Sequence, residues 1–133
     1  MKSTQAGVNR RALKKLFQEI GSEVRLRLIL RDFYRRMAAD ILIGFFFMGK
    51  NTDDVADKQS EFLLKAMGQV PTYLGKSPPR AHSKLPPILA GHFDRRLKLL
   101  EDTLREHGLA SESIDIWLQF EGSFRGVIVK SEF

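Results

Sequence analysis

The stretch SEVRLRLILRDFYRRMAA, residues 22–39, predicts an amphipathic helix. Ser22 suits the N-cap, because its hydroxyl can accept a hydrogen bond from a backbone N–H of the first turn. Apolar side chains then recur every three or four residues, at Leu26, Ile29, Leu30, Phe33, Tyr34 and Met37. This period places them on one face of the helix. Tyr34 on that face needs a partner for its hydroxyl, since a buried unpaired polar group costs about 1–3 kcal/mol.

The helical period continues on both sides of this stretch. Residues 9–20 predict a helix that stops at Gly21, a residue type that favours helix ends. A further helix is expected from an N-cap at Thr52 to Met67, with aspartates in its first turn that the helix dipole favours.

The second half of the chain predicts two more helices, over residues 89–106 and from a cap at Ser111 onward. The apolar run ILIGFFFMG, residues 41–49, fits a buried corner or a short helix. No alternating run is long enough for a convincing strand. The sequence therefore predicts an all-α domain of five or six helices with one irregular segment of about a dozen residues.

Composition narrows the class of protein. The chain has 133 residues, 43% of them hydrophobic, which suits one globular domain. It has no cysteine, which excludes disulfides, thiolate metal sites and cysteine nucleophiles. The apolar run at residues 41–49 is about half as long as a membrane span, and the N-terminal residues lack a signal-peptide pattern. We expect a soluble cytoplasmic protein that makes no membrane contact.

Positive charge concentrates near the N-terminus. The formal net charge is +6, and residues 1–36 hold ten Lys/Arg against three Asp/Glu. Arg27, Arg31 and Arg35 recur every fourth residue and would form a stripe that could meet nucleic acid, an acidic partner or an anionic membrane. A solvated helix face is the simpler interpretation, because no aromatic or base-reading pattern interleaves the stripe.

A histidine lies between two diproline steps in KSPPRAHSKLPPILAGHF, residues 76–93. Proline fixes φ and lacks a backbone donor, so this segment allows a helical turn or two at most. His82 is thus either an ordinary loop residue or a side chain held in place for a purpose.

Two inward polar residues favour the second interpretation. Gln59 shares a predicted helix face with Val55 and Phe62, and Tyr34 lies on the inner face of its own helix. Each could simply bond a backbone group. Together with His82 they indicate a pocket in which the histidine binds a metal and the other two address its ligand.

Other chemistries fit the sequence less well. GxSxG and HExxH motifs are absent, which argues against a catalytic pair built on His82. A zinc site would have to draw on His82, His92 and His107, whose spacings match no familiar zinc pattern. Haem brings its own equatorial ligands and would need only one histidine.

Three segments resemble the truncated haemoglobins, the short bacterial globins. They are RDFYRRMAADILIGFF (residues 31–46), DKQSEFLLKAMGQVPTYLGK (57–76) and AHSKLPPILAGHFDRRLKLLEDTL (81–104). The resemblance implies a truncated globin-like helical sandwich with a short irregular proximal segment. It implies a single haem-binding domain over residues 1–133, with about 1–8 and 121–133 outside the similarity.

The resemblance also implies roles for individual residues. His82 would be the proximal ligand of the iron of haem b, and Tyr34 and Gln59 would donate hydrogen bonds on the opposite, distal side. The remaining implied contacts are Val55 at the distal gate, Phe47 against the haem with Phe46 behind it, Phe62 and Leu63 along the pocket or a ligand tunnel, and Lys58 and Tyr73 at the propionates.

One position departs from the family pattern. Many relatives have a tryptophan after HFDR, and here the residue is Arg96. Its side chain could extend to solvent or pair with a propionate. It could instead place a guanidinium at the distal site, which would favour an anionic or superoxide-like ligand, or it could reflect a poor fit to haem. The family's paired glycines are also altered, to Gly21-Ser22 and Gly68-Gln69.

The expected function is reversible binding of O2 at a pentacoordinate haem iron, with NO and CO as further ligands. NO dioxygenase or peroxidase-like activity stays open, and it would need an electron donor that could dock on the basic N-terminal face. The alternative is a haem-free helical module that grips nucleic acid or an acidic partner with its arginine stripe, although nucleic acid is the less expected partner.

Overall fold

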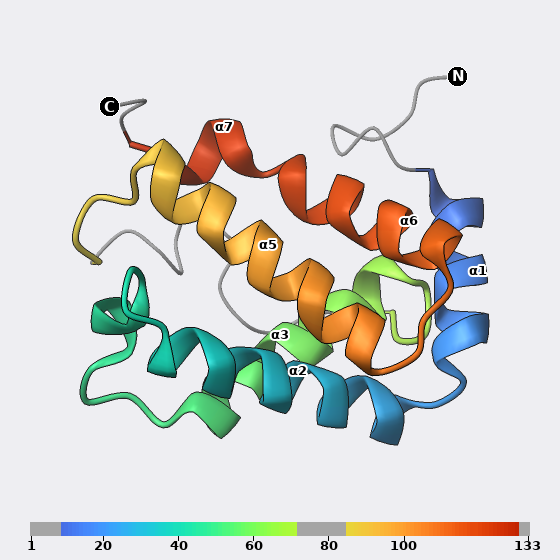
Figure 1. The fold of residues 1–133 in the computed structure, drawn as a ribbon. Coiled ribbons are helices and arrows are strands. Elements are labelled where there is room, and N and C mark those ends of the chain that lie inside the picture. The colour runs from blue at the N-terminus through green and yellow to red at the C-terminus, as the bar shows by residue number, and fades with distance from the viewer. Residues whose placement is uncertain (1–8, 72–84, 131–133) are drawn as a thin grey trace.

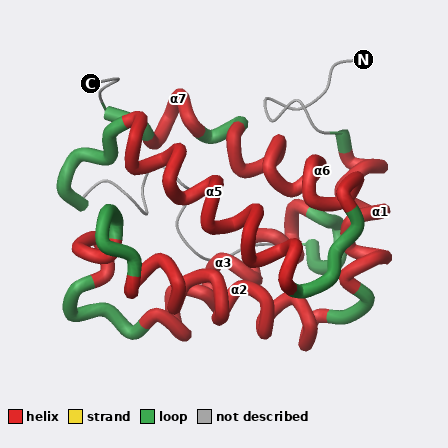
Figure 2. Tube along the Cα trace, in the orientation of Figure 1, coloured by secondary structure: helices red, strands yellow, loops and turns green. Residues whose placement is uncertain are grey.

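The computed structural model describes residues 9–71 and 85–130. Its elements are α1 (Arg10–Ile20), α2 (Glu23–Ala39), the 3-10 helix η1 (Gly44–Phe47), α3 (Thr52–Ala66), α5 (Ala90–Glu106), α6 (Ser111–Gly122) and α7 (Arg125–Ile128). Figure 2 shows helices joined by loops, and the described residues contain no β-strand. The all-α prediction is confirmed.

The helices form two layers. α2 packs against α3, and α5 packs against α6, while α2 and α5 also contact each other and join the layers. Figure 1 shows α5 and α6 running across α2 and α3, with α1 at one end of the molecule. There α1 contacts α6 and α2. The contact between α2 and α5 brings side chains of both layers together in the interior, where Phe33 and Trp117 are completely buried.

Two predicted helices start at residues that act as N-caps, and two predicted N-caps, those of α3 and α6, are wrong. Asn9 and Ser22 accept hydrogen bonds from Ala12 N (2.8 Å) and Arg25 N (3.1 Å), as N-caps do. The predicted cap at Thr52 is wrong by one residue, because Asn51 accepts from Asp54 N instead.

The cap predicted at Ser111 is also wrong. Ala110 occupies the N-cap position of α6 and offers no side-chain bond. The carboxylate of Glu19 in α1 accepts from Ala110 N at 2.8 Å, so a neighbouring helix supplies a bond near this helix start. The expected single last helix ends at Gly122, and the short α7 follows it.

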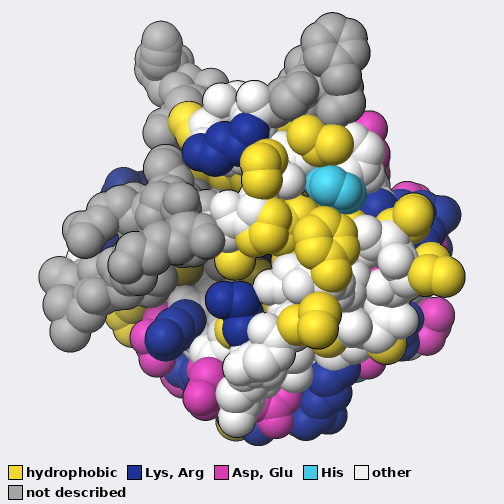
Figure 3. All heavy atoms as spheres, turned by 90° about the vertical axis from the view of Figure 1, so that its left-hand side faces the viewer, with side chains coloured by type: hydrophobic (Ala, Val, Ile, Leu, Met, Phe, Trp, Pro, Cys, Tyr) yellow, Lys and Arg dark blue, Asp and Glu magenta, His cyan; other side chains and the backbone are white. Residues whose placement is uncertain are grey.

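The apolar corner is a short helix, as predicted, but it is only partly buried. Ile43 and Phe46 face the core, whereas Ile41 is 95% and Met48 79% exposed. Gly44 lets the chain return closely against α2, because a Cβ there would lie 2.5 Å from the Ala38 carbonyl oxygen. Figure 3 views this end of the molecule and shows hydrophobic side chains gathered around a histidine.

Among the described residues, no helix has both the length and the apolar character that crossing a membrane requires.

Candidate functional site

One side chain from each of α2, α3, α5 and α6 meets the others in the interior. These residues are Tyr34, Gln59, Arg96 and Glu121, and we call them the polar cluster. The helices that carry them are close to one another in Figure 1 because α2 contacts both α3 and α5, and α5 contacts α6. The cluster therefore depends on the packing of both layers.

Arg96 is the centre of the cluster. Its Nη2 donates to Glu121 Oε1 at 2.7 Å, and its Nη1 lies 3.5 Å from the Tyr34 hydroxyl oxygen. The guanidinium carbon lies 5.1 Å from the ring centroid of Phe33 and 5.7 Å from that of Tyr34, which is cation–π distance. Only 20% of the Arg96 side chain is exposed. The reading in which Arg96 extends to solvent is wrong.

The charge of Arg96 is stabilised inside the protein. Burial opposes the charged form, but the attraction to Glu121 and the hydrogen bonds to Glu121 and Tyr34 outweigh it, so the pKa of Arg96 is raised above its ordinary value. The guanidinium is a permanent cation at this site.

Glu121 is the anion of the cluster, and its side chain is 7% exposed. One carboxylate oxygen accepts from Arg96 and the other accepts from Gln59 Nε2 at 3.3 Å. Both oxygens are therefore engaged, as a buried carboxylate requires.

Tyr34 is 5% exposed, and its ring packs edge-on against Phe33 and Phe47, with centroids 5.3 and 5.8 Å away. Its hydroxyl oxygen accepts the weak bond from Arg96. Within the described part of the chain, the hydroxyl proton has no recorded acceptor. A buried donor with a spare proton beside an aromatic wall fits a site whose ligand accepts a hydrogen bond.

The sequence pattern of the family described as bacterial-like globin matches residues 15–129. The chain belongs to the bacterial-like globins. Among its relatives, the group 1 truncated haemoglobin of Mycolicibacterium paratuberculosis is 30% identical over 99 residues, 74% of this chain and 72% of that protein. The group 1 truncated haemoglobin of Tetrahymena thermophila is 27% identical over 99 residues, 74% of this chain and 81% of that protein.

Solved structures show the same fold. The truncated haemoglobin of Tetrahymena pyriformis, in its Fe(III) form, has a TM-score of 0.77 at 24% identity and covers 86% of this chain and 97% of its own. The 2/2 haemoglobin of Synechococcus sp. PCC 7002, in the cyanomet state with covalently attached haem, has a TM-score of 0.72 at 24% identity and covers 84% and 94%. The predicted family and fold class are confirmed.

In this globin, the two predicted distal donors lie within one hydrogen-bonded cluster, but they are not equivalent. Tyr34 keeps a proton to donate, whereas the Gln59 amide already donates to Glu121. The distal roles of both residues stay predictions, and Tyr34 is the one of the two with a proton left to donate.

The predicted apolar contacts divide into two groups. Phe47 is half-buried and reaches Tyr34, and Val55 is half-buried on α3, so both suit the lining of a pocket. Leu63 is fully buried, and Phe62 packs on Phe120 and Phe124 with ring centroids about 6 Å away, at 6.2 and 5.9 Å. Phe62 therefore packs toward the C-terminal aromatic residues, and Leu63 belongs to the hydrophobic core.

The remaining predicted contacts lie at the edge of the site or outside the described residues. Phe46 is buried and packs on His92 at the start of α5, at 5.1 Å between ring centroids. Lys58 is exposed, as a propionate partner would be. His82 and Tyr73 lie outside the described residues.

The other two histidines have structural partners. His92 Nδ1 accepts from Leu89 N at 3.0 Å at the start of α5. His107 Nε2 lies 2.7 Å from a carboxylate oxygen of Asp32 and ties the end of α5 to α2. In residues 9–71 and 85–130, no three His, Cys, Asp or Glu residues come together as a metal site.

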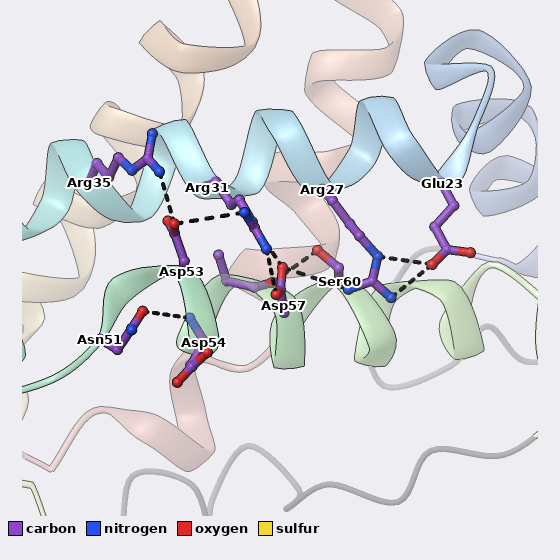
Figure 4. Close-up of polar contacts among 10 residues, drawn as sticks. Glu23, Arg27, Arg31, Arg35, Asn51, Asp53, Asp54, Asp57 and Ser60 are labelled. Atoms are coloured by element: carbon purple, nitrogen blue, oxygen red, sulfur yellow. Dashed lines mark hydrogen bonds and ion pairs between the residues drawn. The ribbon is translucent and has the colours of Figure 1, made fainter.

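The arginine stripe of this globin is not a free surface. Arg31 makes two bonds to Asp57, at 2.8 and 3.1 Å, and Arg35 bonds Asp53 at 2.9 Å, while Arg27 lies 3.7 Å from Asp57. Figure 4 shows these α2 arginines reaching the α3 aspartates, a set that we call the arginine–aspartate ladder. The hydrogen bond from Arg31 lowers the pKa of Asp57. The three arginines stay partly exposed, with Arg35 at 61%, so the stripe is a solvated face whose cations are paired with α3.

Glu121 is the site residue that sequence reasoning missed. It lies in the segment expected to fall outside the resemblance. A signal was nevertheless present, because Glu121 follows the buried Trp117 by four residues, which places both on one helix face. An acid on that face needs a cationic partner, and Arg96 was the cation that the sequence had already placed among the candidate distal residues.

Proposed function

We propose that this globin binds haem b through His82 and reversibly binds O2, with NO and CO as further diatomic ligands. Membership of the bacterial-like globins supports the cofactor, since globins carry their haem on a proximal histidine. The observation that supports O2 binding is the buried hydroxyl of Tyr34, whose proton is available for donation to a ligand.

The haem iron supplies reversible coordination of a diatomic gas when the group is bound. The protein contributes the environment. Tyr34 donates to the ligand, and the neighbouring Arg96 polarises its hydroxyl, which makes it a better donor. Phe47 and Val55 contribute apolar surface that keeps water away. A hydrogen bond to a partly charged ligand is worth about 1–3 kcal/mol, enough to lengthen residence about ten- to a hundredfold.

The alternative binding module is less favoured, because Arg31 and Arg35 of the stripe on which it depends are paired with aspartates of α3. The same pairing weakens the case for the stripe as a docking site for an electron donor. Nothing in the described residues therefore favours NO oxidation or peroxidase activity over gas binding.

An absorption spectrum of the purified protein with added haem tests the proposal, in ferric, dithionite-reduced and CO-bound forms. We expect a strong Soret band that shifts on reduction and again with CO. The variant His82→Ala should lose tight haem binding. The matched control His107→Gln, which alters the end of α5, should retain it. No Soret band with excess haem, or equal haem affinity in His82→Ala, would overturn the proposal.

A further inference from the structure

We propose that Glu121 is an internal anion that reserves the distal site for uncharged ligands by occupying the guanidinium of Arg96. This inference rests on the proposed function and assigns the ligand class of the same site. Arg96 and Glu121 are then specificity-determining residues for ligand charge.

A buried guanidinium by itself would attract anions. Arginine is the side chain best suited to bind anionic groups through paired N–H donors, and low local polarity strengthens such bonds. Arg96 fits this description, because it is 20% exposed and lies between the Tyr34 hydroxyl and the aromatic ring of Phe33.

The carboxylate of Glu121 changes that outcome. It takes the Nη2 of Arg96 at 2.7 Å, and its other oxygen is held by Gln59 at 3.3 Å. An anion that bound the Nη2 of Arg96 would have to displace Glu121 and leave a carboxylate that is 7% exposed without its cation. Leaving one member of a buried ion pair uncompensated is strongly unfavourable.

An uncharged ligand meets no such obstacle. The proton of Tyr34 is available without breaking either bond of Glu121. The site therefore offers a hydrogen bond to a diatomic gas while its positive charge stays neutralised within the protein.

The test compares azide and CO binding in the haem-loaded protein. The variant Glu121→Gln keeps the size of the side chain and removes its charge. We expect the ratio of azide affinity in the ferric form to CO affinity in the ferrous form to rise at least about tenfold. The double variant Arg96→Met/Glu121→Gln should return the ratio toward its original value. Glu112→Gln, an exposed carboxylate on the same helix, is the matched control and should leave the ratio unchanged.

A second measurement needs no haem. Urea unfolding of the apoprotein should show a lower midpoint for Arg96→Met than for Arg96→Met/Glu121→Gln, because only the single variant leaves a buried charge unpaired. Equal midpoints would overturn the inference, as would an unchanged azide-to-CO ratio in a Glu121→Gln protein that binds haem. Failure of every variant and of the parent protein to bind haem would instead overturn the proposed function.

Discussion

Tyr34 is a buried residue whose hydrogen bonding is incomplete among the described residues. Its ring is packed between Phe33 and Phe47, so the hydroxyl is held in one place. Its oxygen accepts from Arg96, but its proton has no acceptor among the described residues. A donor that is rigid and already desolvated can bond a ligand without first losing water or side-chain freedom.

We expect Tyr34→Phe to bind haem normally and to release O2 about ten- to a hundredfold faster, because the ring packing remains while the donor is lost. Stopped-flow displacement of O2 by CO measures the rate. Soret absorbance controls for haem content. An unchanged dissociation rate would remove Tyr34 from the mechanism.

At the scale of the elements, Asp40 joins three of them. It follows the last residue of α2, and one carboxylate oxygen accepts from Leu42 N and Ile43 N in the turn that leads to η1. The other oxygen accepts two bonds from Arg95 of α5, at 2.7 and 3.0 Å. Its side chain is 6% exposed.

The hydrogen bonds of Asp40 make the stability of the fold depend on pH. The hydrogen bond from Arg95 lowers the pKa of Asp40 although burial opposes this effect. The carboxylate therefore stabilises the fold fully above its unfolded pKa of about 3.9, and this contribution is lost as pH falls through the lower folded value.

We expect Asp40→Asn to lower the Tm at neutral pH, since the amide keeps an oxygen for the turn but loses the ion pair. The difference from the parent protein should shrink as the pH falls below about 4. Thermal unfolding from pH 7 to about pH 2 measures this difference. Asp115→Asn on an exposed face of α6 is the control, with little effect at any pH. A Tm difference that is constant across this range would mean that packing, and not charge, is responsible.

The arginine–aspartate ladder is the second feature at this scale, since it joins α2 to α3 along their length (Figure 4). It satisfies arginines that would otherwise form a basic stripe. Removing the charges of the aspartates should therefore leave the α2 arginines unpaired and create a basic surface that could bind anions.

We expect Asp53→Asn/Asp57→Asn to bind double-stranded DNA non-specifically at low salt, at least about tenfold more tightly than the parent protein, and to lose that binding as salt rises. Fluorescence anisotropy with a labelled duplex measures the affinity. Glu112→Gln/Asp115→Asn adds the same charge on α6 and controls for net charge. Equal binding by the two double variants would show that total charge, and not the ladder, governs DNA affinity.

At the scale of the whole molecule, the assembly of the proposed distal site depends on the contact between the two helical layers. The polar cluster takes Tyr34 and Gln59 from one layer and Arg96 and Glu121 from the other. A cofactor bound between them would stabilise the folded state alone, since the unfolded chain cannot reproduce the site.

We expect a slight excess of haem to raise the Tm of the apoprotein by about 10 °C or more, because tight binding to the folded state adds several kcal/mol to the free energy of unfolding. Calorimetry or circular dichroism with and without haem measures the shift. In His82→Ala most of the shift should be absent. A Tm that haem does not move would contradict specific binding.

The sequence by itself determined the helical class and most helix bounds. Caps and stops such as Asn9, Ser22 and Gly21 act within one turn, so they can be read locally. The helical period likewise placed Tyr34 inside, because the period depends only on spacing along one helix. The caps of α3 and α6 were missed, since neighbouring residues and a carboxylate from α1 compete for those positions.

Only the tertiary structure decided which charges meet. Arg96 and Glu121 lie on different helices, and so do Arg31 and Asp57, so neither pair follows from the periodicity of one segment. A helix pattern states which face is buried, but the partner on the facing helix depends on how the layers pack. That packing paired the predicted arginine stripe with aspartates of α3, and it joined Arg96, a candidate distal residue, to Glu121, which the sequence had not singled out.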